Sequence, residues 1–428
     1  MAEIIQESSL GTSVKRDKVA VNCYWLMAGE VSSKLLAFLI TVYLTRTLGS
    51  AKFGLLSFAS AFVMYGMLLT DFGLTKYGTR EIARNPESLK EWVVRIQSTR
   101  LILSTFFFII AALLSWLLLG SLEMKLLFLF SFFWLFPHAI GLDWVYRGFE
   151  KMGYSALWNF VQQAVYLALV LVLVTNKGHL VMVPVCRVAG CLAASVILLI
   201  SLGKLTGFKA FVPVVDAKIL KRVLAAGAPL AASYLMVQIY WNVDTIILGI
   251  VDKPEIVGIY NAAYKIILMA AVACYTVMNA YYPRLSYNYT HNHTNYRRDL
   301  ARMMLIVIAA GIIATSVVFI FRERIILLFY GDDYRKAITA LAFLAFVIFG
   351  DYLVSALATA FIAAGFEKLT FKTVVVGAVS NILFCIILIP RFSFVGAAIA
   401  TIASYAIMIF LYLIRLGNVI GKSESAEA

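Results

Sequence analysis

Long runs of apolar residues, separated by short polar segments, fill most of the chain. The run LILSTFFFIIAALLSWLLLG (101–120) is typical, because its 20 residues match the thickness of a bilayer core and do not alternate as a transmembrane β-strand would. The pattern therefore predicts an all-α polytopic membrane protein. We interpret twelve such runs as transmembrane helices, at residues 20–46, 53–72, 97–120, 124–146, 155–175, 180–202, 222–250, 256–282, 301–321, 337–364, 371–390 and 395–415.

Composition agrees with this pattern. Of the 428 residues, 62% are hydrophobic and 14% are charged, and the mean hydropathy is +0.89. A soluble domain is about half apolar and a quarter charged. The five cysteines lie scattered in apolar runs, without the spacing of a disulfide framework or a metal site, so we expect them to pack as small apolar residues. No metal site and no cofactor is predicted.

Lysine and arginine set the expected topology. With the N-terminus in the cytoplasm, the inner segments hold 24 of the 37 basic residues and the outer segments hold 10, while Lys34, Arg187 and Lys265 lie within spans. Positive charge concentrates on the cytoplasmic side of membrane proteins. We therefore expect both termini in the cytoplasm. The same bias accounts for much of the net charge of +14 without a nucleic-acid partner.

Two short repeats suggest an internal duplication. RGFEKM (147–152) and AGFEKL (364–369) follow spans four and ten, and SAKFGLLSFAS (50–60) and KPEIVGIYNAA (253–263) align Gly54 with Gly258. Because six spans separate the copies, both halves point the same way, as in the parallel repeats of many transporters. We expect two six-helix lobes, at 1–203 and 222–428, joined by a cytoplasmic linker at 204–221. The glycine of each GFEK copy should permit a tight turn.

Ionisable residues inside the spans are the candidate functional residues, because each costs about 2.5–3.5 kcal/mol at the centre of a membrane helix. Glu30 and Lys34 lie four residues apart on span one and can pair. Asp244 of span seven and Lys265 of span eight lie at similar depths on a helical hairpin, so they are a second candidate pair.

Two further residues leave alternatives open. Arg187, in the outer half of span six, either functions inside the protein or snorkels to the outer surface. Asp351, at the middle of span ten, serves either as a proton relay or as a structural hydrogen-bonding group. Asp71 and Asp143 lie at inner span ends beside Lys76 and Arg147, where we expect interfacial ion pairs.

Three segments resemble one known family, the polysaccharide transporters, or Wzx-type lipid-linked oligosaccharide flippases, of the multidrug/oligosaccharidyl-lipid/polysaccharide exporter superfamily. They are TVYLTRTLGSAKFGLLSFASAFVMYGMLLTDFGLTKYGTREIAR (41–84), GLDWVYRGFEKMGYSA (141–156) and NVDTIILGIVDKPEIVGIYNAAYKI (242–266). The similarity runs over essentially the whole chain. It implies two six-helix lobes in a V-shaped, alternating-access fold.

The resemblance also implies a cargo, undecaprenyl-pyrophosphate carrying an oligosaccharide repeat unit, which moves from the inner to the outer leaflet of the bacterial cytoplasmic membrane. Lys34, Lys265 and Arg187 would then face the phosphates, Glu30 and Asp244 would compensate the two lysines, and Asp351 would serve ion coupling. Membrane lipids, a polysaccharide polymerase and a chain-length regulator are the expected partners. No catalytic residues are predicted.

The fold class is also compatible with two other functions. A cation-coupled multidrug antiporter of the same fold would present acidic residues to its cationic cargo, and both signs of charge occur within the spans. A membrane-embedded glycan polymerase or ligase is disfavoured, because the longest outer segment, RERIILLFYGDDYRKA (322–337), is short and no nucleophile or metal cluster accompanies it.

Overall fold

The computed structural model describes residues 12–207, 214 and 217–421, and within them every regular element is helical. The expected cytoplasmic termini fall partly in 1–11 and 422–428, and part of the expected linker falls in 208–213 and 215–216. Those segments lie outside the described residues.

The chain divides into two compact units. The first comprises Met1–Leu48 with Ala59–Leu235, and the second comprises Gly49–Phe58 with Met236–Ala428. The lobe boundaries expected from the sequence stay a prediction.

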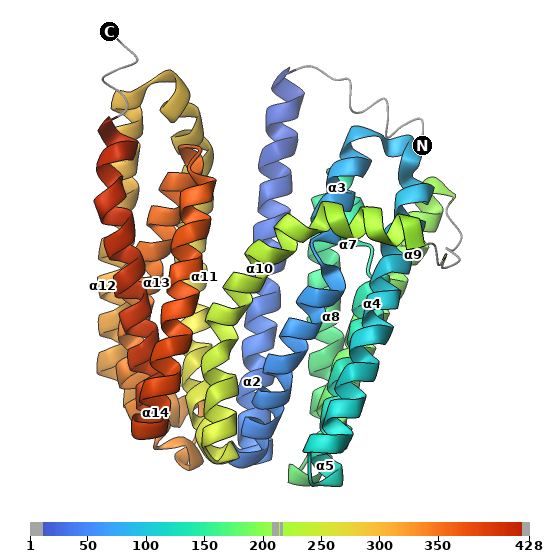
Figure 1. Cartoon of the computed structure of the whole chain (residues 1–428), viewed down its shortest axis with the longest axis vertical. Coiled ribbons are helices and arrows are strands. Elements are labelled where there is room, and N and C mark those ends of the chain that lie inside the picture. Colours follow the sequence, from blue (N-terminus) through green and yellow to red (C-terminus); the bar gives the residue numbers. More distant parts are fainter. Residues whose placement is uncertain (1–11, 208–213, 215–216, 422–428) are drawn as a thin grey trace. The chain divides into compact units, whose positions relative to one another are not determined.

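The first unit is built from long helices that run alternately up and down, joined by short helical segments (Figure 1). Its elements are α2 (Thr12–Asp71) without Gly49–Phe58, α3 (Leu74–Arg84), η1 (Pro86–Ser88), α4 (Leu89–Leu118), α5 (Leu122–Phe133), α6 (Leu135–Ile140), α7 (Asp143–Gly148), α8 (Met152–Leu173), η2 (Lys177–His179), α9 (Met182–Thr206) and the first part of α10 (Ala217–Val251).

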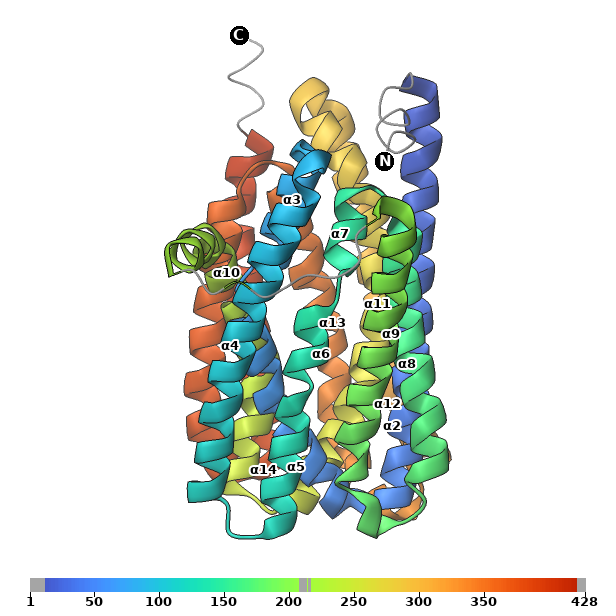
Figure 2. The same cartoon turned by 90° about the vertical axis from the view of Figure 1, so that its right-hand side faces the viewer.

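The basic stretch between spans two and three forms the amphipathic helix α3, which lies at one end of the unit near α7 (Figure 2). It buries Leu74, Gly78 and Ile82, which are four residues apart on one face, and leaves its charged residues outside. A methyl group on Gly78 would collide with the Trp144 ring of α7. The small residue therefore lets α3 and α7 pack closely.

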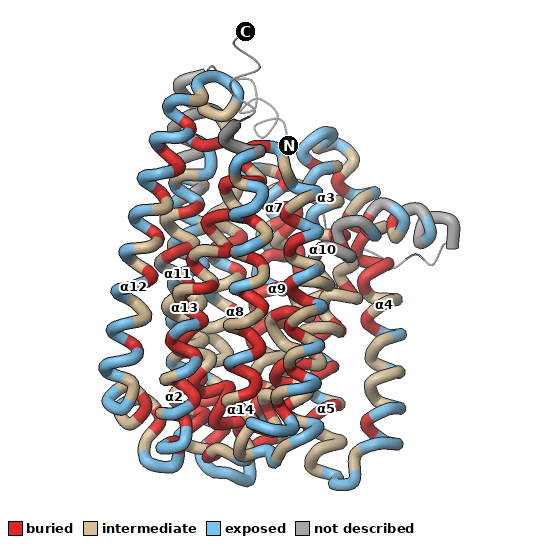
Figure 3. Tube along the Cα trace, turned by 60° about the vertical axis from the view of Figure 1, so that its left-hand side comes forward, coloured by how far each residue is buried: buried red, intermediate tan, exposed pale blue. Residues whose placement is uncertain are grey.

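The second unit packs its helices around α13. Its elements are the end of α10, α11 (Pro254–His291), α12 (His293–Tyr330), η3 (Asp332–Tyr334), α13 (Ala337–Ala363) and α14 (Glu367–Gly421). More than half of the α13 residues are buried. The exposed apolar residues of α12 lie along one side of that helix (Figure 3), as expected of a surface that faces lipid, and include Leu305, Ile312, Ile313 and Ile320.

Two of the long helices each contain two spans. In α2 the break is at Gly49, with φ 74° and ψ 171°, and in α14 it is at Ser393, with φ 53° and ψ −136°. Nine helical segments of the described residues are long and apolar enough to cross a membrane. Once both broken segments are divided and the 35-residue α10 is added, the arrangement is consistent with the predicted twelve spans.

The two GFEK copies make the same kind of turn, but two residues out of register. In the first copy α7 continues through Gly148, and Glu150 takes the left-handed conformation, with Lys151 N–H donating to Tyr146 O. In the second copy Gly365 is left-handed, and Phe366 N–H donates to Phe361 O. Both are helix C-caps of the Schellman type.

The expected role of the motif glycine is therefore correct for Gly365 and wrong for Gly148. Gly148 has no positive φ, and a Cβ there would instead collide with Ile82 of α3 and approach the carbonyl oxygen of Thr79. Gly148 permits close helix packing, and the turn that follows it uses Glu150.

The second repeat has a direct structural counterpart in the contact between Gly54 and Gly258. A Cβ on Gly54 would collide with the carbonyl oxygen of Pro254, and a Cβ on Gly258 would collide with the carbonyl oxygen of Ser50. Spans two and eight thus cross backbone to backbone, and the two residues that the repeat aligns face each other across the crossing.

We predict that both GFEK turns are cytoplasmic. Glu150 and Glu367 are exposed, so single cysteines there, in a variant without the five native cysteines, should react with an impermeant maleimide only after the cells are opened. A cysteine in place of exposed Lys177, on the opposite side of the expected topology, is the control and should react in intact cells. Labelling of either turn in intact cells would contradict the topology.

We predict that Gly258→Ala lowers the thermal unfolding temperature of the purified protein. The added methyl group meets backbone atoms, which cannot rotate away, and overpacking of this kind costs about 1–3 kcal/mol. Gly120→Ala is the matched control, since a Cβ there meets nothing within 4 Å. Equal unfolding temperatures for the two variants would show that the crossing tolerates separation.

Candidate functional site

Span four is a broken helix. It passes through α5, α6 and α7, with Trp134 between the first two and Gly141 after α6. Gly141 has ψ 133°, which is outside the helical range, and Pro137 within α6 has no N–H to donate. The break deprives carbonyl groups at the end of α6 of their helical donors. Within a membrane, such groups must find donors elsewhere in the protein.

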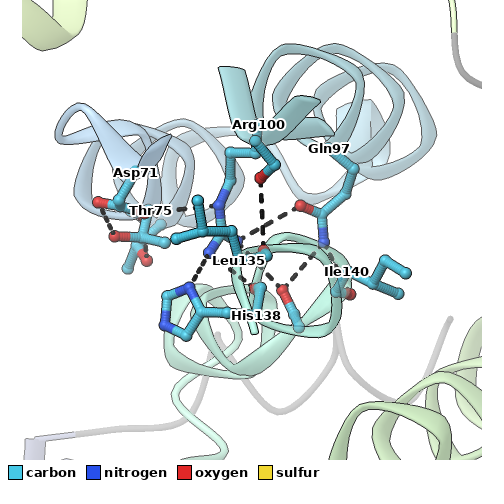
Figure 4. A network of polar contacts seen from close by, with 10 residues as sticks. Asp71, Thr75, Gln97, Arg100, Leu135, His138 and Ile140 are labelled. Atoms are coloured by element: carbon cyan, nitrogen blue, oxygen red, sulfur yellow. Dashed lines mark hydrogen bonds and ion pairs between the residues drawn. The ribbon is translucent and has the colours of Figure 1, made fainter. Parts of the chain in front are cut away.

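Two side chains of α4 supply these donors (Figure 4). Gln97 Nε2 donates to the carbonyls of Ile140 at 3.0 Å and Gly141 at 2.9 Å. Arg100 Nη2 donates to the His138 carbonyl at 2.9 Å, and Nη1 lies 3.4 Å from both Gln97 Oε1 and Gly141 O. The Arg100 side chain is only 1% exposed. The buried guanidinium group therefore donates to backbone carbonyls at the break in span four.

Asp71 compensates this buried charge. Its Oδ1 lies 3.6 Å from Arg100 Nε, and neither atom has a hydrogen bond, whereas Oδ2 accepts from the Thr75 hydroxyl at 3.0 Å. The ion pair is loose but keeps the site neutral. An ion pair at Asp71 agrees with the sequence-based prediction, but nothing in the sequence indicated Arg100 as the partner.

The contact with Arg100 fixes the protonation of His138. His138 Nδ1 lies 3.0 Å from Arg100 Nη2. A guanidinium group can only donate, so Nδ1 accepts and the ring proton is on Nε2. The imidazole packs edge-on against Trp134 and Trp158, with ring centroids 6.1 and 5.9 Å apart. His138 is thus a neutral acceptor in the network.

Arg187 is a second arginine in the interior of this unit. Its Cζ lies 3.6 Å from the centroid of the Trp134 ring, which is 4% exposed. Arg187 itself is half-buried. The same segment that carries the broken span thus contacts both arginines, Arg100 through its carbonyls and Arg187 through its indole ring.

Glu30 and Lys34 form the ion pair that their spacing predicts. Lys34 Nζ lies 2.8 Å from Glu30 Oε1, and the side chains are 36% and 57% exposed, respectively. Lys34 is therefore accessible enough to exchange Glu30 for another anion. Its role toward a substrate stays a prediction.

Asp244 is buried in the second unit. Its carboxylate accepts a hydrogen bond from the Tyr260 hydroxyl and another from the Thr245 N–H, at 2.7 Å. The Thr245 hydroxyl in turn donates to Asn261 Oδ1 at 3.3 Å. Lys265 is half-buried one turn beyond Asn261. The pairing of Asp244 with Lys265 stays a prediction.

Asp351 accepts a hydrogen bond from the Tyr405 hydroxyl at 2.9 Å. This is a structural hydrogen bond of the kind that was one of the two alternatives, and a role in proton relay stays a prediction. In the first unit, Asp143 pairs with Arg147 at 3.0 Å, as the sequence predicts. Among the described residues, no group of three or more His, Cys, Asp or Glu side chains is placed to hold a metal ion.

Comparisons with known proteins cover nearly the whole chain. A family model described as "Polysaccharide biosynthesis protein" matches residues 19–289, and the MatE family model matches residues 229–387. The "Putative O-antigen transporter" of Escherichia coli (strain K12) is 23% identical over 413 residues, which are 93% of this chain and 96% of that protein.

Solved structures confirm the fold class. The inward closed conformation of the lipid II flippase MurJ has a TM-score of 0.73 at 15% identity, covering 91% of this chain and 87% of its own. The inward-facing conformation of a multidrug resistance MATE family transporter has a TM-score of 0.72 at 14% identity, covering 92% of this chain and 98% of its own.

We predict that Arg100→Met destabilises the protein strongly. It removes the Arg100 hydrogen bond to the His138 carbonyl and leaves Asp71 without its cation, and breaking a buried ion pair costs about 3–5 kcal/mol. Thermal unfolding in detergent measures the loss. Arg84→Met is the control, because Arg84 pairs with Glu81 at the surface, where ion pairs contribute little. A similar unfolding temperature for the two variants would mean that Arg100 is dispensable for the break.

Proposed function

Since the chain belongs to the polysaccharide biosynthesis protein family, we propose that it is a flippase for undecaprenyl-pyrophosphate-linked oligosaccharide repeat units of an O-antigen, capsule or exopolysaccharide. It would carry them from the inner to the outer leaflet of the bacterial cytoplasmic membrane, with both termini in the cytoplasm. The observation that carries this proposal is the similarity, over nearly all of the chain, to a protein named for O-antigen transport.

A physical requirement supports the proposal. A sugar-pyrophosphate headgroup cannot cross about 30 Å of hydrocarbon unless protein groups replace its water. Lys34, Lys265 and Arg187 are the cations that would neutralise the two phosphates, because charge-assisted hydrogen bonds to phosphate are strong. Glu30, which holds Lys34 in the ion pair, would be displaced when the phosphate arrives.

The driving force would come from an ion gradient. Asp244 and Asp351 are the carboxyl groups available for coupling in the second unit, and each accepts a hydrogen bond from a tyrosine. After translocation, a polysaccharide polymerase and a chain-length regulator would take over the repeat unit. The proteins to which the chain is similar are named as transporters or flippases, which supports transport over an enzymatic function.

A multidrug-type antiporter is the second candidate. The MatE family model matches residues 229–387, and Asp244 and Asp351 both lie inside that range. The two functions differ in cargo. A deletion strain that became sensitive to cationic drugs, with normal surface polysaccharide, would favour the antiporter.

The proposal is tested by deleting the gene and returning variants of it. We expect the deletion strain to accumulate lipid-linked repeat units on the inner leaflet and to lose surface polysaccharide. Lys34→Ala and Lys265→Ala should fail to restore polysaccharide at normal protein levels, whereas Lys→Arg at either position should restore part of it, because the charge matters more than the shape.

Lys336→Ala is the matched control. Lys336 lies 3.4 Å from Glu255 in an exposed ion pair, so its loss should leave transport unchanged. Normal distribution of repeat units in the deletion strain would overturn the flippase function. Full activity of both alanine variants would overturn the roles of Lys34 and Lys265 alone.

A further inference from the structure

The two interior arginines of the first unit have opposite hydrogen-bonding states. The Nη1 and Nη2 groups of Arg100 are engaged by Gln97, by the carbonyls of the helix break and by His138, and Asp71 compensates its charge. Arg187 stacks on Trp134, but among the described residues no hydrogen bond or ion pair engages its guanidinium group. Arg100 thus stabilises the fold, whereas the N–H groups of Arg187 have no partner among the described residues.

Arg187 also reaches toward the middle of the unit. The Ser195 hydroxyl donates to the Pro137 carbonyl at 3.0 Å, which sets the register between α9 and the broken span. At 1.5 Å per residue, the Cα of Arg187 lies about 12 Å from Ser195 toward the α8–α9 turn, whereas Trp134 lies only about 5 Å from Pro137 in that direction. The Arg187 side chain therefore extends away from the N-terminal end of α9 to reach the Trp134 indole.

Within the part of the chain that the structure describes, no carboxylate pairs with Arg187 to compensate its charge. The carboxylates of the described network are already engaged, because Asp71 faces Arg100 and Asp143 pairs with Arg147. The titratable groups that interact with Arg187 include Tyr166 and Cys191, which are uncharged at neutral pH. A half-buried cation without a counterion is costly, so an anionic ligand would relieve that cost.

The stacking geometry selects the kind of anion. The indole covers one face of the planar guanidinium, so the N–H groups remain available along its edge. Such an edge matches two oxygen atoms of a single carboxylate or phosphate, in a bidentate contact that a lysine cannot reproduce. Trp134 thus orients Arg187 before a ligand arrives.

We infer that Arg187, oriented by Trp134, is a bidentate oxyanion-binding site that receives a carboxylate of an acidic sugar or a phosphate of the transported lipid-linked saccharide. This inference rests on the proposed function for the identity of the ligand. It predicts a site inside the first unit whose specificity depends on the guanidinium shape as well as on its charge, in contrast to the lysine sites at Lys34 and Lys265.

The test measures binding without transport. The full-length protein is placed in nanodiscs of zwitterionic lipid, and thermal unfolding is followed in increasing concentrations of glucuronate, methyl phosphate or glucose, because a ligand that binds only the folded state raises the unfolding temperature. We expect saturable stabilisation by at least one of the two anions and none by glucose. A larger effect of glucuronate identifies a sugar carboxylate as the natural group, and a larger effect of methyl phosphate identifies a phosphate.

The variants separate a binding role from a structural one. Arg187→Gln should weaken anion binding by about tenfold or more, and Arg187→Lys should recover only part of it, since one bidentate contact is lost. Trp134→Leu should weaken binding while Trp134→Phe keeps most of it. Arg322→Gln is the control, because Arg322 also stacks on an aromatic ring, Phe319, but that ring is exposed and Arg322 Nη1 already donates to the Phe319 carbonyl. The variant should therefore bind anions as the wild type does.

Failure of this inference is distinguishable from failure of the proposed function. Absence of anion binding by the wild-type protein, equal stabilisation by glucose, or unchanged binding by Arg187→Gln would overturn the oxyanion site. None of these results alters the distribution of repeat units in the deletion strain, which tests transport itself.

Discussion

The fold of the first unit depends on satisfying the carbonyl groups that the broken span exposes inside the membrane. A buried carbonyl without a donor costs several kcal/mol in hydrocarbon. Arg100 and Gln97 meet this requirement from α4, and the Ser195 hydroxyl meets it from α9 at Pro137. The broken span is therefore held from both sides. These hydrogen bonds therefore determine where the segment that follows the break lies.

The segment beyond the break shows the consequence. α7 is held by hydrogen bonds to three neighbouring helices. The Thr79 hydroxyl of α3 donates to Trp144 O, the Ser155 hydroxyl of α8 donates to Asp143 O, and the Tyr146 hydroxyl of α7 donates to Leu198 O of α9 at 2.8 Å. The turn that follows α7 is thus rigidly placed. Trp134, on which Arg187 lies, belongs to the same broken span, three residues before the Pro137 carbonyl that Ser195 holds. The hydrogen bonds that stabilise the broken span thus also position the aromatic ring of the candidate anion site.

The sequence allowed the membrane spans and the ion pair of Glu30 with Lys34 to be predicted, because each depends on local spacing. The internal repeat aligned Gly54 with Gly258, but only the structure shows that the two residues meet. The role of Arg100 could not be predicted. It is the fourth residue of the third predicted span, and a positive charge so close to the inner end is expected to belong to the cytoplasmic loop. Its partner His138 is 38 residues away. Only the folded chain brings that pair together.

The same limit applies to the second unit and to the turns. Asp244 and Asp351 are recognisable as buried acids, but their tyrosine partners, Tyr260 and Tyr405, are 16 and 54 residues distant. The GFEK repeat correctly located two turns, yet letter-by-letter alignment put Gly148 where the backbone uses Glu150. A short identity can mark equivalent places in a duplicated fold without aligning equivalent residues.

The crossing of Gly54 with Gly258 bears on the origin of the chain. In a symmetric dimer of identical subunits, a residue on the two-fold axis meets its own copy, so both sides of the contact change together when that residue mutates. Fusion of the two copies into one chain separates the two positions, and each can then mutate alone. Two glycines that still meet backbone to backbone are what such an ancestral self-contact would leave behind. Neither could acquire a side chain without forcing the helices apart, so the contact would have constrained both halves while the rest of their sequences diverged.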